Sequence, residues 1–253
     1  MTIKENYKGF VLIVLFVVSA AILYLLDPIA QDFAYHKFSD CRSFFGINHF
    51  MDVISNFPFV VIGLLGIRLA NKAYRKKTMI FFLMTFILFS GVFFTGLGSA
   101  FYHYDPNNFS LIFDRLPMTL VFTPFFATII YDYVDRRIGT VVFYSFITLG
   151  IYSIFYWYYT ELIGLGDLRL YAFVQFFPVV TVPLILLFYK NEHLYSTQIW
   201  LVFGAYTIAK ICEHFDGYIF DFLGVISGHT IKHLFSALAV YFIYTIYQKR
   251  IIT

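Results

Sequence analysis

Charged residues are scarce in this 253-residue chain: only 13% are Asp, Glu, Lys or Arg, while 60% are hydrophobic. Soluble domains carry about 25% charged residues, so a surface this poor in charge cannot lie mostly in water. The net charge of +3 is small, and nothing in the sequence resembles a nucleic-acid-binding patch. The 34 Phe and 21 Tyr suit lipid-facing helices and interfacial belts. The composition therefore predicts an integral membrane protein.

Cysteine is also scarce, since Cys41 and Cys212 are the only two. They could form one disulfide, but two free thiols are the expected state, and the redox compartment cannot be read from them. A signal-peptide cleavage site is lacking as well, because the first hydrophobic run, 9–26, does not end in a small-x-small motif directly before Asp27. We therefore expect this run to be retained as a helix.

Hydrophobic runs recur along the whole chain, and crossing a bilayer takes about 20 apolar residues. The runs lie at 9–26, 52–70, 78–102, 112–133, 139–159, 169–189, 197–213 and 229–247. The polar segment 27–51 is expected to lie at the membrane interface as loop and short helix. No internal repeat or low-complexity stretch is present. The predicted fold class is all-α, a polytopic transmembrane helical bundle of about eight spans with short connections.

Basic and acidic residues gather at opposite ends of these runs. An excess of Lys and Arg marks cytoplasmic loops. With the N-terminus inside, the inner ends collect Lys4, Lys8, Arg68, Lys72, Arg75, Lys76, Lys77, Arg136, Arg137, Lys190, Lys249 and Arg250. Most acidic residues fall at the outer ends, for example Asp27, Asp105 and Asp167. This distribution predicts that both termini are cytoplasmic.

Three of the predicted spans carry polar groups at their outer ends, where ionisable side chains are costly and mark candidate functional sites. One span ends in Ser99-Ala-Phe-Tyr-His103, the next begins near Asp114, and the last begins with His229 and His233. Residues four apart share a helix face, so His229 and His233 can bind one ion, and Ser99 lies on the face of His103. Three histidines with an open fourth position are typical of a catalytic zinc site.

The segment Asp105-Pro-Asn-Asn108 is a strong turn signal. It predicts a tight hairpin that leaves His103 and Asp114 at comparable depth on adjacent helices. A zincin protease is excluded, because Thr230 occupies the place of the catalytic Glu in His-Glu-x-x-His. Asp114 is then the natural carboxylate to accept a proton from an activated water.

Each of these features has a simpler explanation when taken alone. A single His at a helix end is commonly interfacial. Ser99 could be a small helix-packing residue beside Gly96 and Gly98. Asp114 could pair with Arg115 at the interface. Their coincidence on one side of the membrane, at compatible depths, favours a metal site.

A Ser four residues before a His, an Asp eleven residues after it and a distant His-x-x-x-His together resemble the alkaline ceramidases. These enzymes belong to a superfamily of seven-helix membrane hydrolases that includes the adiponectin-type receptors. The matching residues are Asp52-Val-Ile-Ser55-Asn56, Gly98-Ser99, His103, Asp114 and Gly228-His229-x-x-Lys232-His233. The resemblance implies a seven-helix core at 52–253. Segment 1–51 would be an extra N-terminal transmembrane helix and a polar interfacial stretch.

The resemblance also implies a chemistry. Its metal would be a zinc ion bound by His103, His229 and His233, which activates water for attack on an amide carbonyl. Asp114 would be the general base and would later give its proton to the leaving amine. Ser99 would position the water or stabilise the oxyanion. The implied substrate is a ceramide-like N-acyl lipid that enters from the bilayer and is cleaved to a fatty acid and a long-chain base.

The chain departs from the ceramidase pattern in the segment before the first core helix, and the family's tryptophan-containing N-terminal motif is absent. Some ceramidases bind calcium in this segment. Here it has fewer acids and includes Arg42 and His49, so Ca²⁺ is the weaker cofactor candidate beside Zn²⁺. Asp40 and Asp52 could instead cap helices or neutralise Arg42. Segment 213–216, with its two acids near the proposed mouth, is expected to have an interfacial structural role rather than to organise the entrance.

Two other functions compete with the hydrolase. One is a receptor-like bundle that keeps the zinc for structure, and the other is a transporter whose histidines relay protons. Transporters are expected to show inverted repeats or broken helices, and Pro117, Pro178 and Pro183 form no repeated pattern. A receptor would favour a folded terminal domain or a long tail, and both termini are short. The hydrolase is the leading hypothesis, and the oligomeric state is not predicted.

Overall fold

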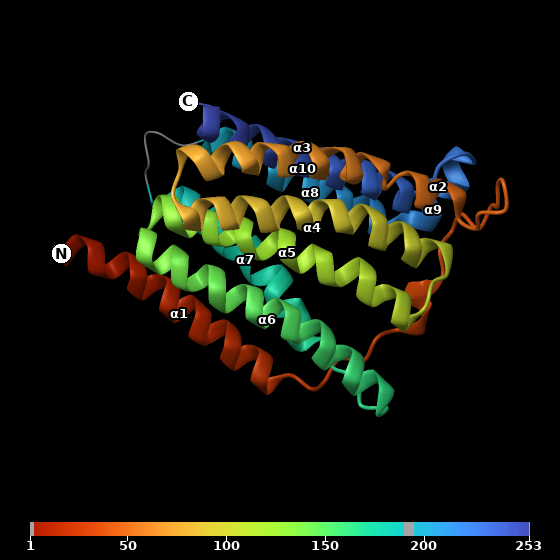
Figure 1. The fold of residues 1–253 in the computed structure, drawn as a ribbon. Helices are drawn as coiled ribbons and strands as arrows, with labels where there is room; N and C mark the ends of the chain where they lie inside the picture. The colour runs from red at the N-terminus through yellow and green to blue at the C-terminus, as the bar shows by residue number, and fades with distance from the viewer. Residues whose placement is uncertain (1–2, 190–194, 253) are drawn as a thin grey trace. The chain divides into compact units, whose positions relative to one another are not determined.

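The computed structural model describes residues 3–189 and 195–252, with side chains from Gly9 onward. These residues form helices and no strand, apart from an isolated bridge between Phe44 and Ile47. The helices are α1 (Ile3–Leu25), the 3-10 helix η1 (Phe33–His36), α2 (Phe50–Ile54), α3 (Phe57–Lys76), α4 (Met79–Tyr104), α5 (Asn108–Tyr133), α6 (Arg136–Leu162), α7 (Arg169–Phe188), α8 (Ser196–His214), α9 (Asp216–Leu223) and α10 (Gly228–Ile252) (Figure 1). The predicted all-helical class is confirmed.

Five helical segments are long and apolar enough to cross a membrane: Phe50–Lys76, which joins α2 and α3, and the helices α4, α5, α6 and α7. A sixth results if α9 and α10, which meet at 109°, count as one bent span. Each of the eight predicted spans is helical, but only five or six of these segments are long and apolar enough to cross a membrane in the described residues, so eight crossings are not confirmed. The described apolar part of α1 is only Gly9–Leu25, and Lys210 and Glu213 make α8 more polar. A multi-pass membrane protein is consistent with this result, and the seven-helix core stays a prediction.

Contacts divide the chain into two compact units, 1–31 with 122–194 and 32–121 with 195–253. The first unit packs α7 against α1 and α6. Phe16 of α1 meets Phe173 and Phe177 of α7 edge-on, with ring centroids 5.4 and 5.9 Å away. None of the predicted site residues belongs to this unit. The division into domains 1–51 and 52–253 stays a prediction.

The second unit contains every predicted site residue. In it α3 packs along α4, α8 along α10, and α10 against α3 (Figure 1). At one end of this packing, α4 finishes and α5 and α10 begin. The basic residues that finish α3 and α10, such as Lys76 and Arg250, lie at the opposite ends of their helices. Lys190, which also entered the topology prediction, lies outside the described residues, as do the side chains of Lys4 and Lys8.

The turn between α4 and α5 has the predicted position, between Tyr104 and Asn108. The Asn107 side chain accepts a hydrogen bond from the Ser110 amide at 3.0 Å, and the Ser110 hydroxyl donates to the Asp105 carbonyl at 2.6 Å. Short polar side chains therefore satisfy backbone groups at the start of α5, as expected of a helix N-terminus. This turn places the beginning of α5 beside the end of α4.

Candidate metal centre

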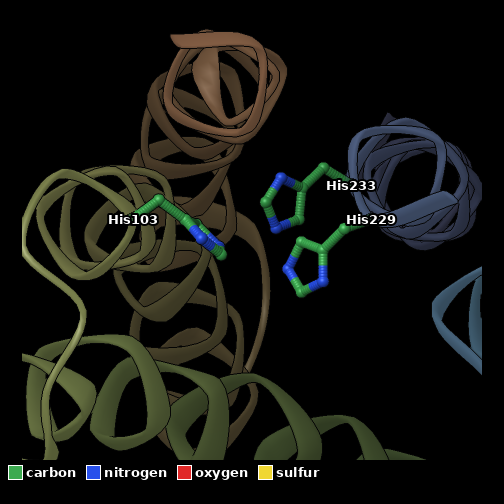
Figure 2. A group of neighbouring side chains, drawn as sticks. All are labelled: His103, His229 and His233. Carbon is green, nitrogen blue, oxygen red and sulfur yellow. The ribbon is translucent and has the colours of Figure 1, made fainter. Parts of the chain in front are cut away.

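Three histidine side chains from two helices converge in the second unit. His103 extends from the last turn of α4 toward His229 and His233, which lie one turn apart near the start of α10 (Figure 2). The three pairs of ring centroids are 4.8, 4.8 and 4.9 Å apart. All three side chains are buried, and one nitrogen from each lies within 4.8 Å of the others. The predicted His cluster is therefore assembled and could bind a metal ion.

The hydrogen bonds of His233 leave one of its ring nitrogens available for an ion. Its Nδ1 lies 2.8 Å from the Ser55 hydroxyl oxygen, and that hydroxyl donates its hydrogen to the Asp52 carbonyl at 3.0 Å. Because a hydroxyl has a single hydrogen, Ser55 accepts from the Nδ1–H of His233. This tautomer leaves the lone pair of His233 on Nε2. Metal-ligating histidines are typically oriented by such a bond on the other nitrogen.

The donor set fits a zinc ion. Among the described residues, the buried Nδ1 of His103 has no hydrogen-bond partner, which is costly unless a ligand is bound. Tetrahedral coordination at about 2.0–2.1 Å places ligand nitrogens about 3.4 Å apart. The possible ligand nitrogens of the three histidines lie within 4.8 Å of one another. Imidazole also suits other transition metals, so the cluster is compatible with zinc without being specific for it.

The start of α10 is fixed by two carboxylates, of which Asp52 is buried. Asp52 is fully buried and accepts hydrogen bonds through Oδ1 from the hydroxyls of Ser227 and Thr230. Asp216 accepts from the backbone amide of His229 at 2.7 Å. On another face of the same turn, Ile231 lines an apolar pocket with side chains of α9. Asp52 thus satisfies polar groups at a helix N-terminus, in agreement with the alternative that it caps a helix. Asp216 makes a structural contact at the same helix start, and an interfacial position of segment 213–216 stays a prediction.

Ser99 and Asp114 meet beside the cluster, on adjacent helices. Both side chains are buried, and the Ser99 hydroxyl lies near enough to the Asp114 carboxylate to interact with it. The helices approach closely at Gly98, where an added Cβ would lie only 1.8 Å from the Phe113 carbonyl oxygen. A glycine is therefore required at this crossing, and it sets the depth of Asp114 relative to His103.

Glu213 of α8 pairs with two lysines, Lys232 on α10 and Lys210 on its own helix. Its Oε1 accepts from Lys232 at 2.7 Å, and its Oε2 accepts from Lys210. The Nζ atom of Lys232 also lies 3.4 Å from Nε2 of His229. The sequence motifs included Lys232 but assigned it no role, because its partner on α8 is set by packing. We call these three residues the Lys-Glu-Lys cluster.

Phe38 covers the metal centre from the loop between η1 and α2. Its ring centroid lies 4.5 Å from that of His103 and 4.7 Å from that of His229, and its side chain is buried. In the same region, His49 donates from Nδ1 to the carbonyl oxygen of His103 at 2.9 Å. No spacing pattern relates a loop phenylalanine to these histidines, so sequence reasoning missed Phe38.

The loop that carries Phe38 is tied down by Asp40 and Arg42. The Asp40 carboxylate accepts from the guanidinium at 2.7 and 2.6 Å, and Arg42 also donates to the carbonyl oxygens of Gly224 and Val225. Asp40 therefore neutralises Arg42, one of the two alternatives to calcium binding. These hydrogen bonds from Arg42 lower the pKa of Asp40 below its ordinary value of 3.8.

Asp40→Asn is expected to destabilise the protein only when Asp40 is ionised in the native state. A lowered native pKa contributes stability that is complete above the unfolded-state pKa and is lost as the pH falls through the native value. Because the Arg42 side chain is 37% exposed, solvent screening limits the pair to about 1 kcal/mol or less at neutral pH. Thermal unfolding in detergent from pH 7 to pH 3 measures this difference. A gap between variant and wild type that stays constant over this range would contradict the assignment.

Ser55→Ala is expected to weaken metal binding roughly 10- to 100-fold, because loss of an outer hydrogen-bond partner frees the ring of a ligating histidine. Competition with a chromogenic zinc chelator measures the affinity. Ser43→Ala is the matched control, since the Ser43 hydroxyl bonds only to Asn48 in an exposed loop. Equal affinities for Ser55→Ala and wild type would show that Ser55 does not orient His233.

Comparison with known proteins gave no match: no family model, no curated protein and no solved structure matches this chain.

Proposed function

We propose that this chain is a zinc-dependent amide hydrolase that cleaves ceramide-like N-acyl lipids to a fatty acid and a long-chain base. The observation that carries the proposal is the buried His103, His229 and His233 cluster, with the buried Ser99 and Asp114 on the helices beside it. A closed structural zinc site would use four protein ligands. The lipid class rests on the resemblance to the alkaline ceramidases.

The neighbouring side chains divide the work of hydrolysis. A bound zinc ion would supply Lewis acidity and lower the pKa of water toward neutrality. Asp114 accepts a proton from the attacking water as its oxygen joins the carbonyl carbon. The C–N bond then breaks, and Asp114 returns the proton to the departing nitrogen. The products are a carboxylate and an amine. Ser99, which lies near Asp114, positions the attacking water or stabilises the developing oxyanion.

The position of the site suits a lipid substrate. His103, Asp114 and His229 all lie near the ends of apolar helices, where the polar part of a membrane lipid is expected. Basic residues end α3 and α10 at the other side of the same unit. The positive-inside rule assigns that basic side, and both termini, to the cytoplasm. The site then lies toward the non-cytoplasmic side, and the substrate enters from the bilayer.

A panel of N-acyl lipids incubated with the purified, zinc-loaded protein in lipid nanodiscs tests the proposal. We expect release of free fatty acid and of the corresponding amine, loss of release with a chelator, and recovery when zinc is restored. Release of neither product from any lipid, by protein that contains one zinc per chain, would overturn the proposal. That outcome would instead favour the receptor-like bundle, for which the cover formed by Phe38 over His103 and His229 is the supporting observation.

A further inference from the structure

Lys232 is a mostly buried cation beside the metal centre, and the proposed hydrolysis leaves it without a role. Its side chain is 17% exposed. It lies one residue before the ligand His233, and its ammonium approaches Nε2 of His229 to 3.4 Å. A buried ammonium needs compensation for its lost hydration. Glu213, at 2.7 Å, supplies part of it.

The Lys-Glu-Lys cluster contains two ammonium groups and one carboxylate, so it carries one positive charge in excess. Lys232 also interacts electrostatically with Asp114 across the site. During the proposed reaction Asp114 takes up a proton and becomes neutral, while negative charge develops on the carbonyl oxygen of the substrate. The negative charge near Lys232 thus moves from the Asp114 carboxylate to the carbonyl oxygen of the substrate.

Lys232 has hydrogen-bond donors to offer that oxygen. An ammonium has three N–H donors, and Glu213 accepts one of them. If His229 binds a metal through Nε2, the lone pair of that nitrogen is no longer open to Lys232. An ammonium cannot coordinate a metal, but it binds negatively charged oxygen strongly.

We propose that Lys232 binds the oxygen of the acyl carbonyl and, after cleavage, the carboxylate of the fatty acid. The reaction step rests on the proposed hydrolase function, whereas the affinity for a long-chain carboxylate can be measured without turnover. Glu213 positions Lys232 from α8, and Lys210 pairs with Glu213 on the same helix. The site accordingly prefers a long-chain carboxylate to an uncharged molecule of the same chain length.

Equilibrium binding of hexadecanoate and of hexadecanol to the zinc-loaded protein tests this preference. Loss of a hydrogen bond to a charged group corresponds to roughly 10- to 100-fold in affinity. We expect Lys232→Met to weaken hexadecanoate binding by about this factor and to leave hexadecanol binding unchanged. General loosening of the fold would weaken both ligands alike, so the ratio of their affinities isolates the charge. Any contact between the carboxylate of hexadecanoate and the metal is the same in all variants, so it does not affect the comparison between them.

Lys210→Met is the matched control, because it removes the other lysine of the same cluster, whose side chain is 41% exposed. It is expected to change the ratio less than about 2-fold, as for an exposed pair. Lys232→Arg, which keeps the charge, is expected to retain a preference for hexadecanoate and serves if the methionine variant does not fold. A wild-type ratio in Lys232→Met, or loss of the preference in Lys232→Arg with zinc still bound, would overturn the proposal. Carboxylate binding through Lys232 without lipid hydrolysis would support this inference and contradict the proposed function.

Discussion

Purified His229→Ala and His233→Ala proteins are expected to contain no zinc after dialysis, whereas the wild type retains about one ion per chain. Each substitution removes one of three imidazoles that lie within 4.8 Å of one another. The loss in affinity should exceed the roughly 10- to 100-fold caused by removing an outer partner, because a direct ligand is lost. Elemental analysis of the dialysed proteins measures the metal content.

A histidine of the same unit outside the cluster is the control for this experiment. The His36 side chain bonds to Tyr102 and Asn108 and is not part of the metal cluster. Removal of that imidazole in His36→Ala should leave the zinc content unchanged. Full zinc occupancy in both His229→Ala and His233→Ala would refute the ligand assignment, whatever the activity of the protein.

The second large effect is expected from Asp114→Asn. The amide has nearly the shape of the carboxylate, but it cannot accept a proton. Loss of a general base typically lowers turnover by roughly 10²- to 10⁴-fold. We expect the rate of fatty acid release to fall by about this factor. Zinc content and protein abundance should stay at wild-type values, because Asp114 is not one of the clustered ligands.

Asp221→Asn, which changes an exposed carboxylate of α9, is the control for the altered charge. It should turn over lipid at the wild-type rate, as measured by fatty acid release per zinc ion. Undiminished turnover in Asp114→Asn would remove Asp114 as the base. A loss of zinc together with turnover in that variant would indicate a structural role for the carboxylate instead.

The parts of the fold and site that follow local rules could be predicted from the sequence. Long apolar runs gave the helices, and the turn at 105–108 predicted the hairpin between α4 and α5. The four-residue spacing of His229 and His233 predicted a shared helix face, and the structure brings His103 to that face (Figure 2). Helical periodicity acts over a few residues, so a motif within one helix carries its own geometry.

The contacts that orient these residues could not be predicted, because they join segments far apart in the sequence. Ser55 reaches His233, and Phe38 covers His103 and His229, through packing that no periodicity describes. The predicted number of membrane crossings is not confirmed. The helix α8 is apolar on average and still ends in Lys210 and Glu213, and the pairing of Glu213 with Lys232 of α10 is visible only in three dimensions.

The first turn of α10 contacts a different neighbour on each of its faces. His229 and His233 face α4, Thr230 bonds to α2, Ile231 meets α9 and Lys232 pairs with α8. Successive residues of a helix are about 100° apart around its axis, so a rotation by that amount would exchange all four partners at once. An axial rotation of α10 would therefore break up the site. Substitutions on any of these faces should consequently affect the others, and their effects should be non-additive.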